Sequence, residues 1–497
     1  MSPTPRRRLT GVLAALTLAL TSLFVAPIPA RAADTVDAAA AAFGLSRYVT
    51  TEFSGGGDIT SRFGAAVSQS YQDVAHVVHL AGGSYVLSGA YAPRVAANVY
   101  VVADPTTKVA ARGSATSVIS FTSGSAGLYG GTWNGSGSTS GSSSVVLSTA
   151  GSLRVIGATV TGAKLDGVYV KGPGAHLSAT NLTATANRRH GVNLERAGGT
   201  ISHSHLDGNG LAVTGSTTGK LGNGLNVSVS ATATVTSTSM SRNRVNGIAL
   251  GSSGATASVT GGTLSSNGRH GANTSPGTRL TLVNATLAGN GFSGVLSSGR
   301  STFVSLGGVS ISGTARDGVS VASGGSATLS RTTVSGSRHS NLSVSPGSSL
   351  TLRDGNKITK AQSYGIVVTR GKLTISGRSN VVANGRIHGI LVQTSSTAVI
   401  SGAVNVTGNR GDGLRVKSKS KLTISGAGTV LQWSKGAGLV VMDKGTSGRI
   451  TQRITVKKNG TGIVVKSKAT LTMVSATITG NKGKAIKIQS KGKLTKV

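Results

Sequence analysis

The sequence predicts an all-β fold in which the chain winds as a parallel β-helix, and three observations support this prediction. The 497 residues include 73 Gly but only 3% aromatic residues, and Ser, Thr and Val are abundant. This composition is typical of strands joined by tight turns. A Gly followed by apolar-x-apolar recurs at a nearly constant interval. Each interval holds three short strand-like segments, which from Gly365 are "GIVV", "KLTIS" and "NVVAN".

The interval of the repeat decides between β architectures. Twelve of the thirteen gaps between repeat positions are 23 to 25 residues, and the other is 33. Three strands in about 24 residues make one turn of a parallel β-helix, whereas a propeller blade needs about 40 residues, so we expect about 16 turns. Asn341 replaces a Gly, and we expect left-handed backbone there because Asn tolerates it. The repeat positions are Gly167, Gly191, Gly224, Gly247, Gly271, Gly294, Gly318, Asn341, Gly365, Gly389, Gly413, Gly438, Gly462 and Ala485.

An Asn often stands four residues before the repeat Gly. In a stacked coil these side chains lie above one another, one turn of about 4.8 Å apart. Stacked Asn side chains hydrogen-bond along the axis and satisfy the backbone of the turn. The pattern therefore predicts a structural row, at Asn187, Asn243, Asn267, Asn290, Asn409 and Asn481.

Two segments near the N-terminus carry a resemblance. "VVHLAGGSYVLSG" (Val77–Gly89) is similar to the strand–Gly–Tyr entry of right-handed parallel β-helix proteins, and "GGTWNG" (Gly130–Gly135) resembles a polygalacturonase-like stretch. The chain thus resembles the superfamily that includes pectate lyases and polygalacturonases. The resemblance implies a right-handed helix, with carbohydrate-active chemistry as a common but not universal function.

The chain divides into three parts. Residues 1–32 read as a secretory signal, with "RRR" at Arg6–Arg8, an apolar stretch and "ARA" at Ala30–Ala32. Residues 33–97 contain two helix-like stretches, which we expect to form a small N-terminal cap over the first turn. Residues 98–497 form the β-helix domain. We expect a secreted monomer, with no transmembrane segment after signal cleavage.

The charge points to an anionic partner. The net charge is +37, and from residue 401 to 497 there are 19 Lys and Arg against two Asp. Such a surface attracts polyanions, and export favours a polysaccharide or wall polymer over a specific nucleic acid. Lys on edge strands also prevents end-to-end stacking, so both interpretations of these lysines stay open. The binding candidates here are Lys417, Lys419, Lys421, Lys466 and Lys468.

Catalytic candidates lie in the row just before the repeat Gly. This row places Asp166 beside His190, and His388 beside Asp412, in successive turns. Asp, Asn and His are also common turn residues, so the row has a structural interpretation too. Only the first pair adjoins two arginines and the long gap, whose extra residues predict a loop beside a concavity from Gly210 to Gly222. The catalytic candidates are Asp166, His190, Arg188 and Arg189.

The strand after the repeat Gly supplies further binding candidates. Its middle residue is expected to face solvent, and the first turns are polar there. Lys171 and Glu195 share a register, which predicts a surface ion pair. The binding candidates on these turns are Tyr169, Lys171, Asn193, Glu195 and Asn226.

The residues favour some reactions over others. "HSHLD" (His203–Asp207) has the spacing of a two-His, one-carboxylate metal site, but Leu206 aligns with core positions, so we expect no metal or other cofactor. No two carboxylates share a register in adjacent turns, which argues against glycoside hydrolysis. A metal-free β-elimination needs a base and a cation, which His and Arg supply.

These observations leave three hypotheses. The first is an exported β-helix protein that binds anionic polysaccharide or wall polymer. The second is a polysaccharide lyase that acts by β-elimination on a uronate polymer. The third is a surface-structural or adhesin-like protein. The sequence leaves open whether the protein is an enzyme.

Overall fold

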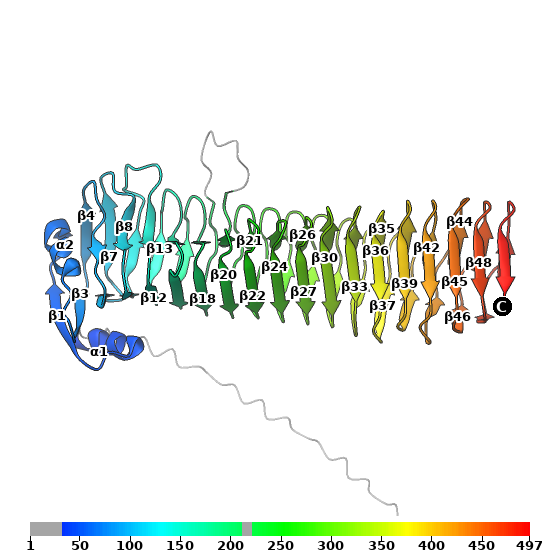
Figure 1. The fold of residues 1–497 in the computed structure, drawn as a ribbon, viewed down its shortest axis with the longest axis horizontal. Helices are drawn as coiled ribbons and strands as arrows, with labels where there is room; N and C mark the ends of the chain where they lie inside the picture. The colour runs from blue at the N-terminus through cyan, green and yellow to red at the C-terminus, as the bar shows by residue number, and fades with distance from the viewer. Residues whose placement is uncertain (1–31, 211–220) are drawn as a thin grey trace, which may run out of the picture.

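The computed structural model describes residues 32–210 and 221–497 and confirms the predicted fold class. The strands are short, and their pairings within the described ranges are parallel. They stack into an elongated solenoid with the helices at its N-terminal end (Figure 1). The predicted signal segment 1–32 lies outside the described residues except for Ala32. Neither helix of the described ranges is long and apolar enough to span a bilayer.

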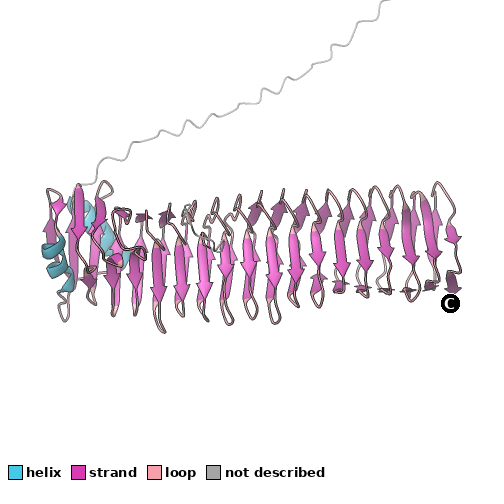
Figure 2. Cartoon of the chain, turned by 90° about the horizontal axis from the view of Figure 1, so that it is seen from above, coloured by secondary structure: helices cyan, strands magenta, loops and turns pink. Residues whose placement is uncertain are grey.

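Most turns contribute one strand to each of three sheets, but between β16 (Thr183–Thr185) and β25 (Thr286–Ala288) the third side is held by isolated bridges such as that of His205 with Ser239. In one turn, β35 (Ile366–Thr369) lies in sheet I, β36 (Lys372–Ile375) in sheet II and β37 (Asn380–Ala383) in sheet III. The equivalent strands of the next turn pair with them in direct register, so that Ile366 lies beside Ile390. Strands of successive turns therefore run side by side along the molecule (Figure 2).

Sheets I and II run nearly the whole length of the solenoid. Sheet I extends from β5 (Arg94–Val95) to β50 (Ile486–Ile488). Sheet II extends from β1 (Tyr48–Phe53) to β51 (Lys493–Lys496) and has 19 strands. It exceeds the predicted 16 turns in part because β1 and β3 (Ala75–Leu80), which precede residue 98, pair into it.

The core consists of apolar columns inside the solenoid. The inward residues of one turn, such as Val368, Leu373 and Val382, have no exposed surface. Because side chains alternate along a strand, every second residue joins this core. Burying one such side chain contributes roughly 1.5–3 kcal/mol, and the columns repeat this contribution in each turn.

The two helices cover different surfaces. Helix α2 (Thr60–Ser68) buries Phe63 and Val67 in the main core, so it closes the N-terminal end of the solenoid. Helix α1 (Ala32–Phe43) instead packs Phe43 on the outer face of sheet II, where its ring lies 4.8 Å from that of Tyr100. The predicted N-terminal helical cap is confirmed, although α1 covers the side of the first turns and not their end. The reason is that β6 (Val99–Ala103) is buried on both faces and needs an apolar cover outside as well.

The Asn row forms the predicted ladder from Asn187 to Asn290, whereas Asn409 accepts the Gly385 N–H without a neighbouring Asn. Asn243 Nδ2 donates to Asn267 Oδ1 at 3.2 Å, and Asn267 Nδ2 donates to Asn290 Oδ1 at 3.1 Å. Each Asn oxygen also accepts a backbone N–H of the preceding turn, as Asn267 does from Asn243 at 3.0 Å. Asn209, inside the long gap, continues the ladder between Asn187 and Asn243 although the repeat alignment missed it.

The repeat position requires Gly because successive turns leave no space for a Cβ, and not because the backbone is left-handed. A Cβ on Gly389 would lie 2.6 Å from the carbonyl oxygen of Gly413 in the next turn. Neither this Gly nor Asn341 has a positive φ. The expected left-handed conformation at Asn341 is therefore wrong, because the constraint at this position is the close approach of successive turns.

Candidate functional site

At eight of the repeat positions, the residue just before belongs to a second hydrogen-bond ladder. Its side chain accepts the backbone N–H of the equivalent residue one turn on. His190 N donates to Asp166 Oδ1 at 3.2 Å, and Asn223 N donates to His190 Nδ1 at 3.2 Å. In the other predicted pair, Asp412 N donates to His388 Nδ1 at 2.9 Å. The same bond recurs at Asn223–Asn246, Asn246–His270, His270–Ser293, Asp317–Ser340 and Asp412–Ala437.

This ladder explains why Asp, Asn and His alternate in one row. Each supplies an acceptor atom at a similar distance from its backbone, and each is buried at the corner. A buried N–H without a partner would cost about 1–3 kcal/mol. The row therefore has a structural function in every turn where the bond forms.

Asp166 is a fully buried carboxylate whose oxygens are occupied. Arg189 Nε donates to it at 2.8 Å, and the Arg189 Nη2 group also binds it. Asn193 Nδ2 donates at 3.0 Å, in addition to the His190 N–H. The structure thus brings three of the four catalytic candidates together, while Arg188 is exposed on the same corner. Because Asp166 and Arg189 neutralise each other, neither is free to act on a polymer.

The corner histidines are held neutral. Burial lowers the pKa of His190 to about 4, partly opposed by the Asp166 charge and reinforced by Arg189. Burial also lowers the pKa of His270 and His388 to about 4, with Arg269 and Arg415 respectively adding to the effect. At neutral pH these side chains accept a hydrogen bond through Nδ1 and keep a single proton on Nε2, so they lack the second proton of an imidazolium acid.

The predicted ion pair between Lys171 and Glu195 does not form, although the two residues are in register. Glu195 accepts the Tyr169 hydroxyl at 2.5 Å, and Lys171 lies over the Tyr169 ring at 5.5 Å. Burial, together with the Glu195 carboxylate, raises the pKa of the Tyr169 phenol above its usual range. The Tyr169 hydroxyl, and not the Lys171 ammonium, binds the Glu195 carboxylate, because the hydroxyl lies closer to it and is partly removed from water.

The middle row of sheet I is less exposed than expected. Asn193 is 5% exposed because it bonds both Asp166 and Asn226 Nδ2, the latter at 2.8 Å. Leu391 and Val440 are also buried, at 2% and 3%. Long side chains about 4.8 Å apart in one row cover each other, so this row does not form a continuous polar groove.

The "HSHLD" segment holds a carboxylate that the next turn satisfies. Asp207 accepts Ser239 Oγ at 2.8 Å and Ser241 N at 2.6 Å, and His205 Nδ1 lies 3.8 Å away. Among the described residues, no three His, Asp or Glu side chains gather as metal ligands would. The expected loop and concavity from Gly210 to Gly222 fall largely on residues 211–220, outside the described part of the chain.

The candidate lysines of the C-terminal turns lie at the corner between sheets I and II. Lys417 follows β41 (Leu414–Val416), and Lys421 begins β42 (Lys421–Ile424). Lys466 ends β47 (Thr461–Lys466), and Lys468 lies in the turn after it. The lysines of these turns therefore lie along the solenoid axis at the corner between sheets I and II.

Several of these lysines occupy left-handed backbone. The φ angles of Lys419, Lys468 and Lys491 are 62°, 61° and 59°, each directly after a Ser that is also left-handed. Such a conformation costs a residue with a Cβ about 1–2 kcal/mol, and Gly or Asn would suit it better. The sequence places a charged side chain here in spite of the backbone.

A second row of cations, which the sequence analysis missed, follows the corner between sheets III and I. It consists of the residue that begins this corner in the eight turns where that residue is Lys or Arg. In most of them its backbone N–H donates to the turn before, as Arg410 N does to Gly385 O at 3.0 Å. The sequence could have predicted this row, because most of its residues stand three positions before a repeat Gly. We call this the basic corner row: Lys164, Arg188, Arg244, Arg338, Arg386, Arg410, Lys435 and Lys482.

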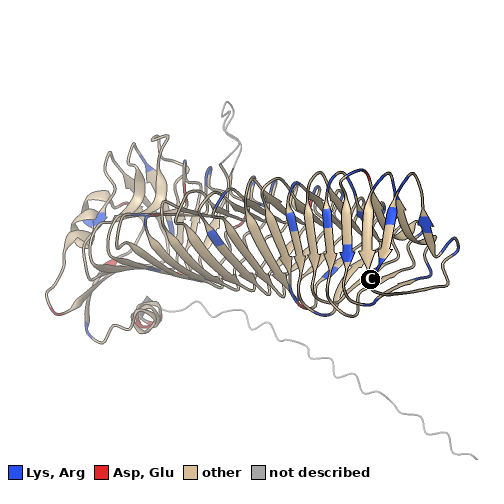
Figure 3. Cartoon of the chain, turned by 45° about the vertical axis from the view of Figure 1, so that its right-hand side comes forward, with Lys and Arg blue, Asp and Glu red and all other residues tan. Residues whose placement is uncertain are grey.

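Sheet I in the C-terminal turns is therefore flanked by cations on both sides. Arg410, Lys435 and Lys482 lie at the corner before it, and the candidate lysines lie at the corner after it. Figure 3 shows Lys and Arg gathering on these turns, with few acidic residues among them. The two Asp of this region are engaged: Asp412 by Arg415 at 2.6 Å, and Asp443 by the Ser418 N–H at 3.1 Å.

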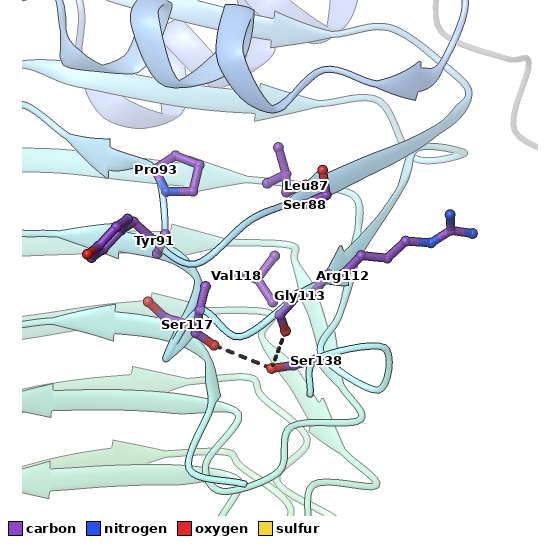
Figure 4. Close-up of a pocket in the computed structure, with 12 residues that line it drawn as sticks. Leu87, Ser88, Tyr91, Pro93, Arg112, Gly113, Ser117, Val118 and Ser138 are labelled. Atoms are coloured by element: carbon purple, nitrogen blue, oxygen red, sulfur yellow. Dashed lines mark hydrogen bonds between the residues drawn. The ribbon is translucent and has the colours of Figure 1, made fainter. Parts of the chain in front are cut away.

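A pocket near the N-terminal cap is too small for a ligand. It lies between Tyr91, Arg112 and Ser138, with a volume of about 10 Å³ (Figure 4). That volume holds about one water molecule. Ser138 Oγ bonds the carbonyl oxygen of Ala115 at 3.3 Å, so its hydroxyl is occupied by the backbone.

Comparison with protein families identifies the class of protein. The family model described as "Right handed beta helix region" matches residues 143–308, 246–404 and 374–496, which together cover more than half of the chain. The chain belongs to this family, and the predicted superfamily is confirmed. Comparison with curated proteins finds no match.

Solved structures with a similar fold include proteins of several functions. The mannuronan C-5 epimerase AlgE6 A-module of Azotobacter vinelandii is 17% identical over 77% of this chain and 93% of its own, with a TM-score of 0.41. The periplasmic alginate epimerase AlgG is 9% identical over 86% and 99%, with a TM-score of 0.38. The Streptococcus pneumoniae surface adhesin PfbA is 8% identical over 74% and 86%, with a TM-score of 0.30. At these identities the likeness concerns the fold alone.

Proposed function

We propose that the protein is exported and binds an anionic polysaccharide or wall polymer along sheet I of its C-terminal turns. The observation that carries the proposal is the arrangement of cations on both corners that flank this sheet. Cations spaced along an axis suit a linear polymer, because each turn meets a new segment of the ligand. Their summed field attracts a polyanion more strongly than any single pair would.

Two further observations support binding rather than solubility alone as the function of these lysines. Solubility requires charge anywhere on the surface, whereas Lys419, Lys468 and Lys491 are placed on left-handed backbone that disfavours them. Of the two carboxylates of the region, Asp412 is paired with Arg415, and Asp443 accepts the Ser418 N–H.

The geometry gives less support to the lyase hypothesis. Its proposed base, His190, is 5% exposed and accepts a backbone N–H. Of its two proposed cations, Arg189 is paired with Asp166, whereas Arg188 is exposed. A base and a cation that abstract a proton next to a uronate carboxylate must both reach the polymer. No observation specifically favours the adhesin hypothesis.

The experiment measures binding of the secreted chain to polygalacturonate as a function of salt. We expect that raising NaCl from about 50 mM to about 300 mM weakens binding by on the order of tenfold or more, because exposed charges are screened. The test variant replaces Lys417, Lys419, Lys421, Lys466 and Lys468 by Gln. The control removes the same charge from exposed residues at the other end: Arg47, Arg62, Arg94, Lys108 and Arg112.

The proposal predicts that only the first variant loses affinity. Equal losses in both variants would show that net charge, and not this surface, binds the polymer. Binding that ignores salt would leave the lysines with a solubility role.

A further inference from the structure

The most unusual exposed side chain of the solenoid is Trp433. It is 55% exposed and has a φ of 57°, directly after β43 (Val430–Gln432). A bulky aromatic residue with positive φ is a genuine outlier. The other tryptophan, Trp133, is fully buried and donates Nε1–H to Gly130 O at 3.1 Å. Packing therefore explains Trp133 but does not explain Trp433.

The equivalent position of neighbouring turns shows what the fold requires there. Asn384, Gly408, Trp433, Lys458 and Gly480 form one column. Each of the first four donates its N–H to the residue before its equivalent in the next turn, as Gly408 N does to Gln432 O at 3.2 Å and Trp433 N to Lys457 O at 3.3 Å. All five have positive φ, between 56° and 66°. The backbone thus favours Gly or Asn. A tryptophan at this position adds strain and exposes a large apolar surface, so its selection points to a function outside the fold.

Trp433 lines an open hollow of about 720 Å³ together with Lys435, Lys458 and Lys482. Lys458, one turn on, lies 4.5 Å from the centre of the indole ring. The other two lysines, Lys435 and Lys482, belong to the basic corner row. No carboxylate lines the hollow, and the indole Nε1 has no hydrogen-bond partner among the described residues. The hollow therefore combines an aromatic face, a free N–H donor and three ammonium groups.

We propose that this hollow is a subsite for a uronate residue of an acidic polysaccharide. The C–H face of the sugar ring stacks on the indole, and its carboxylate is bound by the surrounding lysines. This inference rests on the proposed function and names where one sugar of the polymer is recognised. A nucleic acid has the same charge, but non-specific single-strand binding stacks successive bases on several aromatic side chains. The hollow offers one such ring.

The column also supplies a substitution that separates function from folding. Trp433→Gly introduces the residue of the preceding turn, Gly408, and it removes the strain of a Cβ at positive φ. We expect its stability to equal or exceed that of the original chain. The matched control is Phe303→Ser. Phe303 is likewise an exposed aromatic, 46% exposed with Arg279 at 4.9 Å from its ring, and Ser326 holds its register in the next turn.

The assay follows tryptophan fluorescence while hexagalacturonate is added. Both tryptophans fluoresce, but Trp133 is buried and Trp433 is exposed, so quenching by acrylamide reports on Trp433. We expect hexagalacturonate to protect Trp433 from quenching, and maltohexaose of the same length to have no effect. Affinity, measured by calorimetry, should fall by on the order of tenfold in Trp433→Gly, as for an aromatic anchor, and stay unchanged in Phe303→Ser.

Each other outcome overturns a defined claim. If Trp433→Gly binds hexagalacturonate as well as the original chain, the subsite is wrong while the proposed function stands. If the original chain binds neither hexagalacturonate nor polygalacturonate, the proposed function fails, and the subsite fails with it. If maltohexaose or an oligothymidylate protects Trp433 as well as hexagalacturonate does, the assignment to uronate is wrong.

Discussion

Replacing the three corner histidines by Asn should make the protein more resistant to acid. His190, His270 and His388 each accept a backbone N–H through Nδ1 and have a pKa of about 4 because they are buried. Asn does the same work at Asn223 and Asn246, where its oxygen accepts the N–H at 3.2 Å. The substitution therefore keeps the ladder and removes the titrating group.

The size of the effect follows from proton linkage. Unfolded His has a pKa of about 6.5, so between roughly pH 6.5 and pH 4 the unfolded chain binds more protons than the folded one. Stability contributed by the neutral side chains is fully present above pH 6.5 and is lost as the pH falls through this window. At about pH 5.5 each histidine lowers the free energy of unfolding by about 1.4 kcal/mol, or about 4 kcal/mol for three. Most carboxylates are still ionised at this pH.

Urea unfolding followed by circular dichroism at pH 7.5 and 5.5 measures the difference. The original chain should lose about 4 kcal/mol between the two conditions, and the triple Asn variant should lose much less. The variant and the original chain should have similar stability at pH 7.5. A variant that loses as much as the original chain would refute the reasoning, because the pH dependence would then come from other groups.

Three further substitutions test the ladders and the charged rows. Asn267→Ala should lower the free energy of unfolding by about 2–4 kcal/mol, because it leaves buried N–H groups without acceptors. The control Asn284→Gly, at an exposed position with a φ of 53°, should change it little. Equal effects of the two substitutions in thermal unfolding would contradict the ladder. Arg189→Ala should cost about 3–5 kcal/mol because it leaves a buried carboxylate unpaired, and Arg188→Ala, next to it but exposed, should be nearly neutral in the same assay. Lys419→Gly should keep or raise stability, since it relieves left-handed strain, while it weakens polygalacturonate binding at low salt; unchanged binding would remove this lysine from the surface.

The prominence of Asp and His in the sequence was a poor guide to chemistry. Asp166 and His190 read as acid and base candidates because reactive residue types recur at one register. In the fold that register is a buried corner where any side chain with an acceptor atom satisfies the next N–H. The cations are more informative, because a charged side chain at an exposed corner is not required by the solenoid.

The sequence by itself determined the architecture. Its 24-residue interval, its Gly positions and its Asn row predict a stack of parallel turns, because each is a local requirement that repeats identically in every turn. The sequence also located the basic C-terminal turns. It could not show which side chains are free. Whether Asp166 is exposed depends on Arg189 and Asn193, and whether Glu195 pairs with Lys171 depends on the nearby Tyr169 hydroxyl. Trp433 became a candidate only when the turns were stacked, because its left-handed backbone, its exposure and the lysines around it come from three successive turns. Contacts between residues some 25 positions apart are properties of the stack, and only the tertiary structure decides them.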